Sequence, residues 1–235
     1  MSEEWETEIA SSGEDAVIRG EKLEDVMDMD FADAIWLLLK GEKPTEEESE
    51  IFNTVLSSSI DHGVGNPSSV SARTVQSGGN DMNTSVAAGI MALGDSHGGA
   101  IDEAMELLQS NKSAEEIVEE YLENGEKIPG IGHKVYEDED PRTAKMFEKA
   151  EELGVAGKHI QKIKEIQEVF AEKKVSLVIN VDGGIGAVMS DLGWEPELGK
   201  GFFIIARTPG LVAHVREEMD EENFRRQDGE YVGEE

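Results

Sequence analysis

Apolar residues recur at intervals of three and four along most of this chain, the spacing that places them on one face of an α-helix. Between residues 24 and 40 the repeating positions are Val26, Met27, Phe31, Ala34, Ile35, Leu38 and Leu39. This spacing predicts one amphipathic helix that ends at Gly41. Pro44 and Thr45 precede three glutamates, so a second helix is expected from there, with Thr45 as its N-cap and acids in its first turn.

The same spacing predicts further helices at about 81–93, 101–109, 114–123, 143–153, 159–173 and 184–192. Pro196 is expected to begin the last long helix, with an interruption at residues 207–210 and an end near Glu222. Residues 175–181 are rich in branched side chains, and propensity alone predicts a strand there. Residues 1–20 are expected to form an irregular arm, and the residues after 223 an extended one. The pattern as a whole predicts eight or more helices with little strand.

Charge adds a second constraint. The chain of 235 residues is long enough to bury a core, and its 52 acidic and 21 basic residues give a formal charge of −31. Such a carboxylate-covered surface repels itself, and salt screens that repulsion, so we expect a protein of a halophile's cytoplasm. An acidic interaction protein is the plainer alternative. No basic face can be assembled for nucleic acid.

The remaining composition excludes several classes. The chain has no cysteine, which rules out disulfides and thiol nucleophiles. Its acidic start is unlike a signal peptide, and no apolar run approaches the roughly 20 residues of a membrane span. We therefore expect no membrane association.

Residues 57–100 are short of acids and contain His62 and His97, each followed by glycine. The helix predicted between the two histidines consists mostly of small residues, so it can pack closely against neighbours. Four glycine-bordered loops present a polar residue in all: D-H-G at 61–63, S-H-G-G at 96–99, G-I-G-H at 130–133 and N-V-D-G-G at 180–184. A lone histidine is more often structural than catalytic, but four such loops favour one shared site. His159 and His214 lack this context and are interpreted as ordinary helix residues.

Arg142, Arg207 and Arg226 lie beside Pro or Gly or in the tail. Arginine clamps carboxylates through two hydrogen bonds, so these residues suggest an anionic ligand, although each alone could be a surface ion pair. Together with the histidines and one aspartate they predict a pocket for a small polycarboxylate that undergoes proton transfer. The histidines could also bind a metal, but none has the short spacing of a metal motif, and we expect no metal. Phosphate-binding and nucleophile-elbow motifs are absent from the sequence.

Taken in order, these motifs resemble the citrate synthase family. The similarity runs from A-I-W-L-L-L-K-G-E-K-P-T-E-E-E at 34–48 through D-H-G, S-H-G-G-A, G-I-G-H-K-V-Y, D-P-R, N-V-D-G and A-R-T-P-G to the final R-x-x-x-x-Y-V-G. The segments L-G-D-S-H-G-G-A-I-D and L-V-I-N-V-D-G-G-I-G-A-V are most similar to the citryl-CoA lyase branch, including the lyase module of ATP-citrate lyase. The resemblance implies an all-α fold, in which a large helical domain (1–100 and 198–235) and a small one (101–197) close over the active site of a homodimer. It also implies that the strand expected at 175–181 does not form.

The resemblance further implies roles for individual residues. His97 and Asp182 would act on the acetyl-CoA end of the substrate and His133 on the oxaloacetate carbonyl. Dicarboxylate binding would fall to His62, Arg142, Arg207 and Arg226, the last reaching the partner subunit's site. Lys134, Gly130 and Gly132 would contact coenzyme A, which is a substrate, so no cofactor is expected.

Two features depart from the family pattern. The chain is much shorter than a full-length citrate synthase, and Glu137, Asp138, Glu139 and Asp140 stand where the family often has a basic residue near the CoA phosphates. The resemblance implies a citryl-CoA lyase, with a citryl-CoA-forming partner as a further expectation. The alternatives are citrate synthase, which also hydrolyses the thioester, and a non-catalytic relative that binds CoA or a partner.

Overall fold

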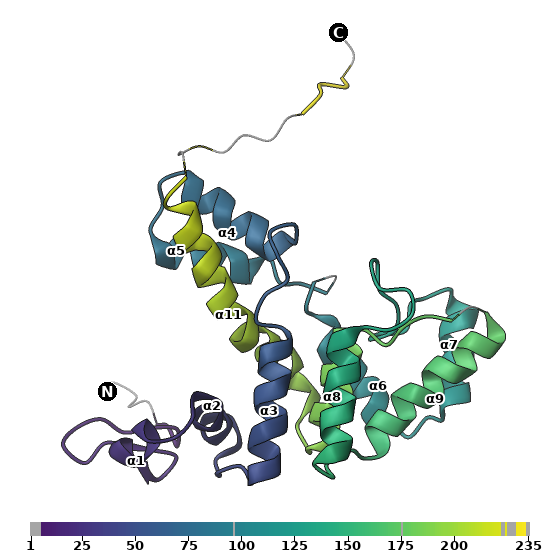
Figure 1. The fold of residues 1–235 in the computed structure, drawn as a ribbon, viewed down its shortest axis with the longest axis horizontal. Helices are drawn as coiled ribbons and strands as arrows, with labels where there is room; N and C mark the ends of the chain where they lie inside the picture. The colour runs from purple at the N-terminus through teal and green to yellow at the C-terminus, as the bar shows by residue number, and fades with distance from the viewer. Residues whose placement is uncertain (1–5, 96, 175, 222–223, 225–228, 234–235) are drawn as a thin grey trace.

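The computed structural model describes residues 6–95, 97–174, 176–221, 224 and 229–233. Within them the chain forms eleven α-helices, one 3-10 turn and one two-stranded hairpin. The prediction of an all-α fold is confirmed. Figure 1 shows three groups of elements: α1–α3, the protruding α4, α5 and second half of α11, and α6–α10 on the other side.

The first elements are the hairpin strands β1 (Val17–Ile18) and β2 (Glu21–Lys22), followed by the helices α1 (Leu23–Met27), α2 (Phe31–Lys40) and α3 (Glu46–Ser58). Two more helices complete the first half of the chain, α4 (Pro67–Ser77) and α5 (Met82–Met91). The second half contains α6 (Ala100–Gln109), α7 (Ala114–Asn124), α8 (Pro141–Glu152), α9 (Lys158–Lys173), α10 (Val181–Asp191), a 3-10 turn (Pro196–Leu198) and α11 (Gly199–Glu218).

Several helix boundaries follow from local chemistry. The predicted cap at Thr45 is confirmed, because its hydroxyl accepts from the Glu48 amide at 3.2 Å and the Glu48 carboxylate accepts from the Thr45 amide at 2.8 Å. Asn66 caps α4 with one bond, its side-chain oxygen accepting from the Ser69 amide at 3.0 Å, and Pro67 occupies the first helical position. The sequence interpretation missed α4, although Asn-Pro is a recognised helix start.

The N-terminal expectations were wrong in two places. The helix expected at 24–40 is two helices, because Asp28 ends α1 and the extended Asp30 begins α2. Met27 and Phe31, counted as its apolar face, are exposed at 75% and 79%. Part of the arm expected to be irregular forms the β1–β2 hairpin.

The interruption expected in the last helix is also absent. α11 runs unbroken from Gly199 to Glu218 with Pro209 inside it. Proline has no amide hydrogen to donate to the Ile205 carbonyl, so the helix loses one bond there but continues. The helix ends at Glu218, and residues 219–221 are not helical, so the end predicted near Glu222 is a few residues too late.

The strand predicted at 175–181 does not form among residues 176–181. Ile179 makes one isolated bridge with Ile131, and α10 begins at Val181. Val178, Ile179 and Val181 are buried. The branched side chains therefore reflect burial and not membership of a sheet.

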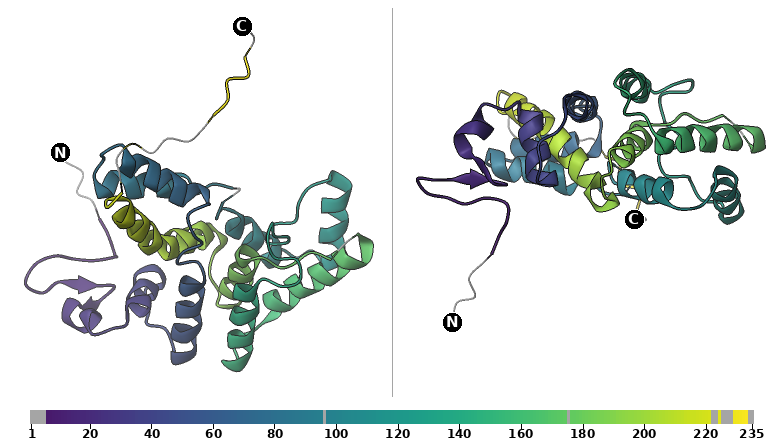
Figure 2. Two further views of the ribbon diagram at one scale, coloured as in Figure 1. Left: turned by 45° about the horizontal axis from the view of Figure 1, so that its top comes forward. Right: turned by 90° about the horizontal axis from the view of Figure 1, so that it is seen from below.

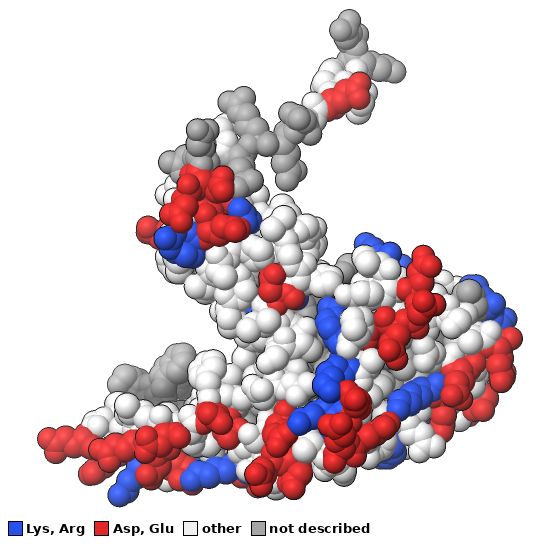
Figure 3. All heavy atoms as spheres, viewed as in Figure 1, with Lys and Arg blue, Asp and Glu red and all other residues white. Residues whose placement is uncertain are grey.

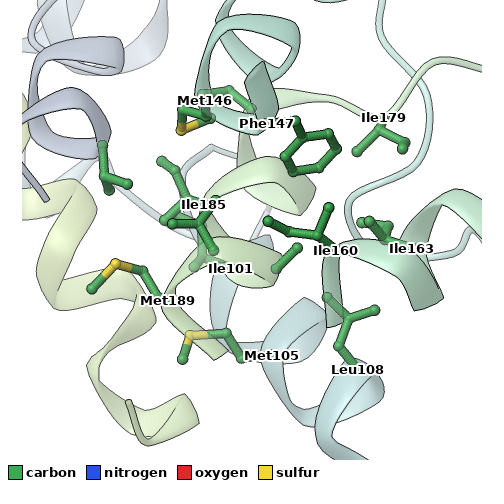
Figure 4. Packing of buried hydrophobic residues seen from close by; sticks show 14 of the residues in the cluster. Ile101, Met105, Leu108, Met146, Phe147, Ile160, Ile163, Ile179, Ile185 and Met189 are labelled. Carbon is green, nitrogen blue, oxygen red and sulfur yellow. The ribbon is translucent and has the colours of Figure 1, made fainter. Parts of the chain in front are cut away.

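The core surrounds α10, which contacts α6, α8 and α9 and is almost wholly buried. Figure 4 shows Met146 and Phe147 of α8, Ile101 and Met105 of α6, and Ile185 of α10 converging on one interior. The same cluster continues into α2 and α3, so it crosses the boundary between the two expected domains. That division into domains stays a prediction.

An aromatic cluster joins the N-terminal helices to this core. The ring of Trp36 contacts those of Phe52 and Trp194 edge-on, with centroids 5.3 Å and 4.9 Å away, and Phe202 closes the group. The Lys40 ammonium lies 4.5 Å from the Trp194 ring and donates to the Gly193 carbonyl at 3.1 Å. These contacts fix α2 and α3 against the start of α11.

The charged side chains and the C-terminal tail have distinct places on the molecule. Acidic side chains cover much of the lower and right-hand parts of the face in Figure 3, whereas the surface between them and α4 carries few charges. The described tail segment, residues 229–233, extends away from the helices (Figures 1 and 2). In the described part of the chain, every helix is too short or too polar to cross a membrane.

Truncation of the aromatic cluster should destabilise the fold. Phe52 is fully buried, so Phe52→Ala should lower the free energy of unfolding by about 3–5 kcal/mol through lost burial and a residual cavity. The matched control is Phe31→Ala at an exposed ring, which should change it by less than about 0.5 kcal/mol. Urea unfolding in molar salt measures both, and equal effects would contradict the assignment of the core.

Candidate active site

Six of the residues singled out from the sequence line one small cavity of about 150 Å³. They are His62, His97, His133, Arg142, Asp182 and Arg207. Gly98, Asn180, Val181 and Phe203 complete the lining. Arg226 lies outside the described residues. The cavity gathers side chains from loops and helices more than 140 residues apart in the chain.

A wider cavity of about 820 Å³ shares His62, His97 and His133 with the first. Gly132 and Lys134 line it, as do Lys127 and Lys174. Gly130 lines neither cavity. Its φ is +81°, and a Cβ there would lie 2.5 Å from the Cα of Gly183, so glycine is needed for backbone packing.

His97 lies in a tight loop before α6. Its Nε2 lies 2.9 Å from the Ser68 hydroxyl and accepts from the Ser68 amide at 3.4 Å. The Ser68 hydroxyl donates its hydrogen to Asn66 Oδ1 at 2.7 Å, but the Ser68 amide can only donate, so Nε2 accepts from it and the neutral ring carries its proton on Nδ1. Burial, helped by the charge of Arg207, lowers the pKa of His97, so the ring is neutral at pH 7 and can donate through Nδ1.

His133 is held in the opposite tautomer. Its Nδ1 accepts from the backbone amides of Val135 and Tyr136, both at 3.0 Å, so its proton lies on Nε2. The ring stacks on Tyr136 with centroids 4.6 Å apart. Burial and the Arg142 charge lower the pKa of His133 despite the opposing effect of Asp140. The two amides at Nδ1 leave Nε2 as the atom for proton exchange.

Arg142 is oriented by Asp140, the N-cap of α8. The buried Asp140 carboxylate accepts from Arg142 Nε at 2.9 Å and from Nη2 at 2.7 Å. Burial acts against ionisation, but these bonds and the guanidinium charge outweigh it and lower the pKa of Asp140. Asp140 therefore supports an arginine of the small cavity from behind, whereas Glu137, Asp138 and Glu139 are exposed.

Arg207 is the most buried cation of the site, with 1% of its surface exposed. Its Nε donates to the Ser59 carbonyl at 2.9 Å, and its guanidinium lies 4.9 Å from the Phe203 ring. Its Nη1 is buried and has no hydrogen-bond partner among the described residues. An unpaired buried donor of this kind is costly, and an anionic ligand in the cavity would satisfy it.

Asp182 lies in the first turn of α10, behind the cap residue Asn180. The Asn180 side chain accepts from the Asp182 and Gly183 amides at 3.0 and 3.1 Å and donates to the Gly132 carbonyl at 2.8 Å. This network joins the loop of His133 to the helix of Asp182. Burial raises the pKa of Asp182 to about 6, although Arg142 and Arg207 favour its charged form.

His62 approaches His133 from the other side of the cavity, with ring centroids 6.3 Å apart. Burial and the charges of Arg142 and Arg207 lower the pKa of His62. The cavity thus combines two arginines with three neutral imidazoles and a carboxyl that titrates near neutrality. Such a set can bind a small anion and move protons beside it.

Sequence reasoning missed four contributors to this site, Ser68, Asp140, Asn180 and Phe203. Two of them could have been predicted as helix N-caps, since Asp140 precedes Pro141 and Asn180 precedes a small-residue helix. Ser68 and Phe203 reach the cavity only through packing. His214, interpreted as an ordinary helix residue, hydrogen-bonds to Asp61. No group of metal-binding side chains was found among the described residues.

The residues that line this cavity are suited to binding a small anion and moving protons beside it. The family model for the C-terminal domain of citrate synthase matches residues 6–227. The chain belongs to the citrate synthase family.

Individual relatives refine the comparison. The chain is 33% identical to the citrate synthase of Haloferax volcanii over 84% of its length, and 32% identical to that of Deinococcus radiodurans over 93%. It spans only 54% and 61% of those two proteins.

Two solved structures are similar over nearly all of this chain. The structure of citryl-CoA lyase from Hydrogenobacter thermophilus has a TM-score of 0.93 and 46% identity, covering 98% of this chain and 95% of that one. ATP citrate lyase from Methanothrix soehngenii, in complex with citrate and coenzyme A, has a TM-score of 0.86 and 26% identity, covering all of this chain and 42% of the other.

The raised pKa of Asp182 predicts how the free energy of unfolding depends on pH. Its carboxyl binds a proton more tightly in the folded state (pKa about 6) than in the unfolded state (3.8), so ionisation of Asp182 reduces stability as the pH rises between these values. Asp182→Asn removes this penalty and should exceed the wild type in unfolding free energy by up to about 3 kcal/mol at pH 8. The difference should shrink toward pH 4.5.

Urea unfolding across this pH range in molar salt measures the difference. The control is Asp95→Asn. The Asp95 side chain is 90% exposed, so its loss should change the unfolding free energy equally at each pH. A difference for Asp182→Asn that is constant with pH would contradict the raised pKa.

Proposed function

We propose that this protein is a citryl-CoA lyase, which reversibly cleaves citryl-CoA to acetyl-CoA and oxaloacetate. The observation that carries the proposal is similarity to the Hydrogenobacter lyase over nearly the whole of both chains, whereas the citrate synthases named above are matched over little more than half their length. The site supports it, because both the anion-binding and the proton-transferring groups are in place.

The dicarboxylate end of the substrate would occupy the small cavity. Arg142, held by Asp140, and Arg207, with its unpaired Nη1, would bind the carboxylates, and His62 would add a third contact. Arg226 would supply a further contact from the tail of a partner subunit. The wider cavity would hold coenzyme A, with Lys134, Lys127 and Lys174 near its phosphates and Gly132 at the loop between the two cavities.

His133 and the substrate oxygen would exchange one proton. In the condensing direction, Nε2–H donates to the keto oxygen. Cleavage is this step run backwards: because neutral His133 already carries its proton on Nε2, the ring must first release that proton to solvent, and Nε2 then takes the proton of the citryl hydroxyl as that oxygen becomes the keto group of oxaloacetate. The two amides at Nδ1 stabilise the charge that the ring gains when Nε2 gives up its proton.

As this keto group forms, the carbon–carbon bond breaks and its electron pair leaves with the thioester as the enolate of acetyl-CoA. Nδ1–H of His97 would donate to its oxygen, where negative charge develops. Asp182 would deliver its proton to the terminal carbon and form the methyl group. A carboxyl with a pKa near 6 holds its proton better than an ordinary aspartate and suits this step.

We also propose that the protein forms a homodimer. α5 carries no charged side chain in a chain of charge −31, and Met91 at its end is 82% exposed. An uncharged helix on an acidic molecule suits contact with a second copy. We further propose that the protein works in a salt-rich cytoplasm and that a separate enzyme forms its citryl-CoA.

Two incubations in molar salt test the reaction and its alternatives. The protein is given citryl-CoA, and separately acetyl-CoA with oxaloacetate while free thiol is followed. Acetyl-CoA formed in the first alone supports a lyase. Thiol release in the second identifies a citrate synthase, the activity of the Haloferax relative. If neither acetyl-CoA nor free thiol is formed, the protein is a non-catalytic binder and the proposal is overturned.

The role of Asp182 is tested by removal of its carboxyl. Asp182→Ala should lower kcat by about 10²–10⁴-fold, because no acid remains to protonate the enol carbon. Oxaloacetate binding, measured by calorimetry, should change by less than about threefold, because the arginines and histidines that hold the dicarboxylate remain. An equal loss of turnover and binding would contradict this division of roles.

A further inference from the structure

One face of α11 holds the loop that contains His62. Arg207, Gly210 and His214 are spaced by three and four residues, so they lie on the same side of the helix. Arg207 donates to the Ser59 carbonyl at 2.9 Å, and His214 Nε2 lies 2.9 Å from Asp61 Oδ1. A Cβ at Gly210 would lie 2.2 Å from the Ile60 carbonyl oxygen, so the loop rests directly on the helix backbone.

Asp61 connects this face to the backbone around His62. Its second carboxylate oxygen accepts from the Gly63 amide at 2.8 Å, which closes a turn around His62. Burial acts against ionisation, but the Gly63 amide and His214 outweigh it and lower the pKa of Asp61. The carboxylate is therefore charged at neutral pH, and His214 must carry its proton on Nε2 to donate to it.

The His62 ring has no hydrogen-bond partner of its own among the described residues. Its position therefore depends on the backbone of residues 61–63, which Asp61 fixes to α11. Arg207 belongs to the same helix face and reaches the same cavity. The contact between Asp61 and His214 thus sets the distance between two groups that line the cavity.

We propose that Asp61 and His214 are positioning residues. They hold His62 at a fixed distance from Arg207 and so set the affinity for the dicarboxylate. The identity of that ligand rests on the proposed function, whereas the positioning itself does not. Neither residue lines the cavity, so both act through His62.

The chain contains a matched control for this pair. His159 and Asp191 also form a contact of 2.9 Å, with a His side chain 10% exposed compared with 11% for His214. This second pair joins α9 to the end of α10, and neither member lines the small cavity. Loss of its imidazole removes a contact of the same kind but does not change the loop of His62.

Three variants test the proposal in molar salt. His214→Ala should weaken oxaloacetate binding about tenfold and raise KM for citryl-CoA, with kcat changed by less than about threefold. His214→Gln should restore binding to within about threefold, because its amide nitrogen can reach Asp61 as Nε2 does. His159→Ala should leave binding unchanged. The proposal is overturned if His214→Ala binds normally, if glutamine fails to rescue, or if His159→Ala weakens binding equally.

A second readout does not depend on activity. In ¹⁵N–¹H spectra of the histidine side chains, the His62 resonances should move in His214→Ala and stay in His159→Ala. If His214→Ala does not fold, Asp61→Asn replaces it, because asparagine can still accept from the Gly63 amide. Unmoved His62 resonances in the variant used would overturn the proposal. A wild type that neither binds oxaloacetate nor cleaves citryl-CoA would refute the proposed function, and the spectra would still decide the positioning.

Discussion

The close approach of Gly130 to Gly183 is the contact on which the rest of the site depends. A Cβ at Gly183 would lie 2.5 Å from the Gly130 carbonyl oxygen, so only glycine allows the His133 loop to lie against the start of α10. Asn180 then joins the two segments by capping the helix and binding the Gly132 carbonyl. Without this contact, His133 and Asp182 would have no fixed separation, and the proton transfers proposed for them require one.

The cavity differs in charge from the surface around it, and its chemistry depends on that difference. Most of the molecule presents carboxylates to water, whereas the cavity brings Arg142 and Arg207 together with imidazoles whose lowered pKa values keep them neutral. One buried aspartate, Asp140, orients an arginine, and another, Asp182, is kept partly protonated by its burial. The same residue type therefore provides a fixed anion in one place and a carboxyl that can hold a proton near neutral pH in the other, because the two carboxyls differ in their hydrogen bonds.

The structure also shows why some helices were easier to predict than others. The segments that became α3, α7 and α9 carry regular apolar spacing with a cap or a glycine at one end or both. α7 and α9 lie within one residue of the predicted bounds, and α3 begins directly after its predicted cap, Thr45. The strand prediction at 175–181 failed because burial selects branched residues, here Val178 and Ile179, in a buried loop as well as in a strand. The interruption expected at Pro209 failed because α11 packs against α3, α4, α5 and α6, and these contacts outweigh one lost backbone bond.

The sequence by itself determined the helical class, the acidic surface and the four loops that carry His62, His97, His133 and Asp182, because periodicity, charge and glycine-bordered motifs are local properties. Only the tertiary structure decided which atoms of those loops can act. The tautomers of His97 and His133 depend on backbone amides, of Ser68 in one case and of Val135 and Tyr136 in the other. The pairing of Arg142 with Asp140 and the burial of Arg207 likewise arise from packing. Proton positions and pKa values depend on neighbours a few ångströms away in space, and no spacing along the chain records those neighbours.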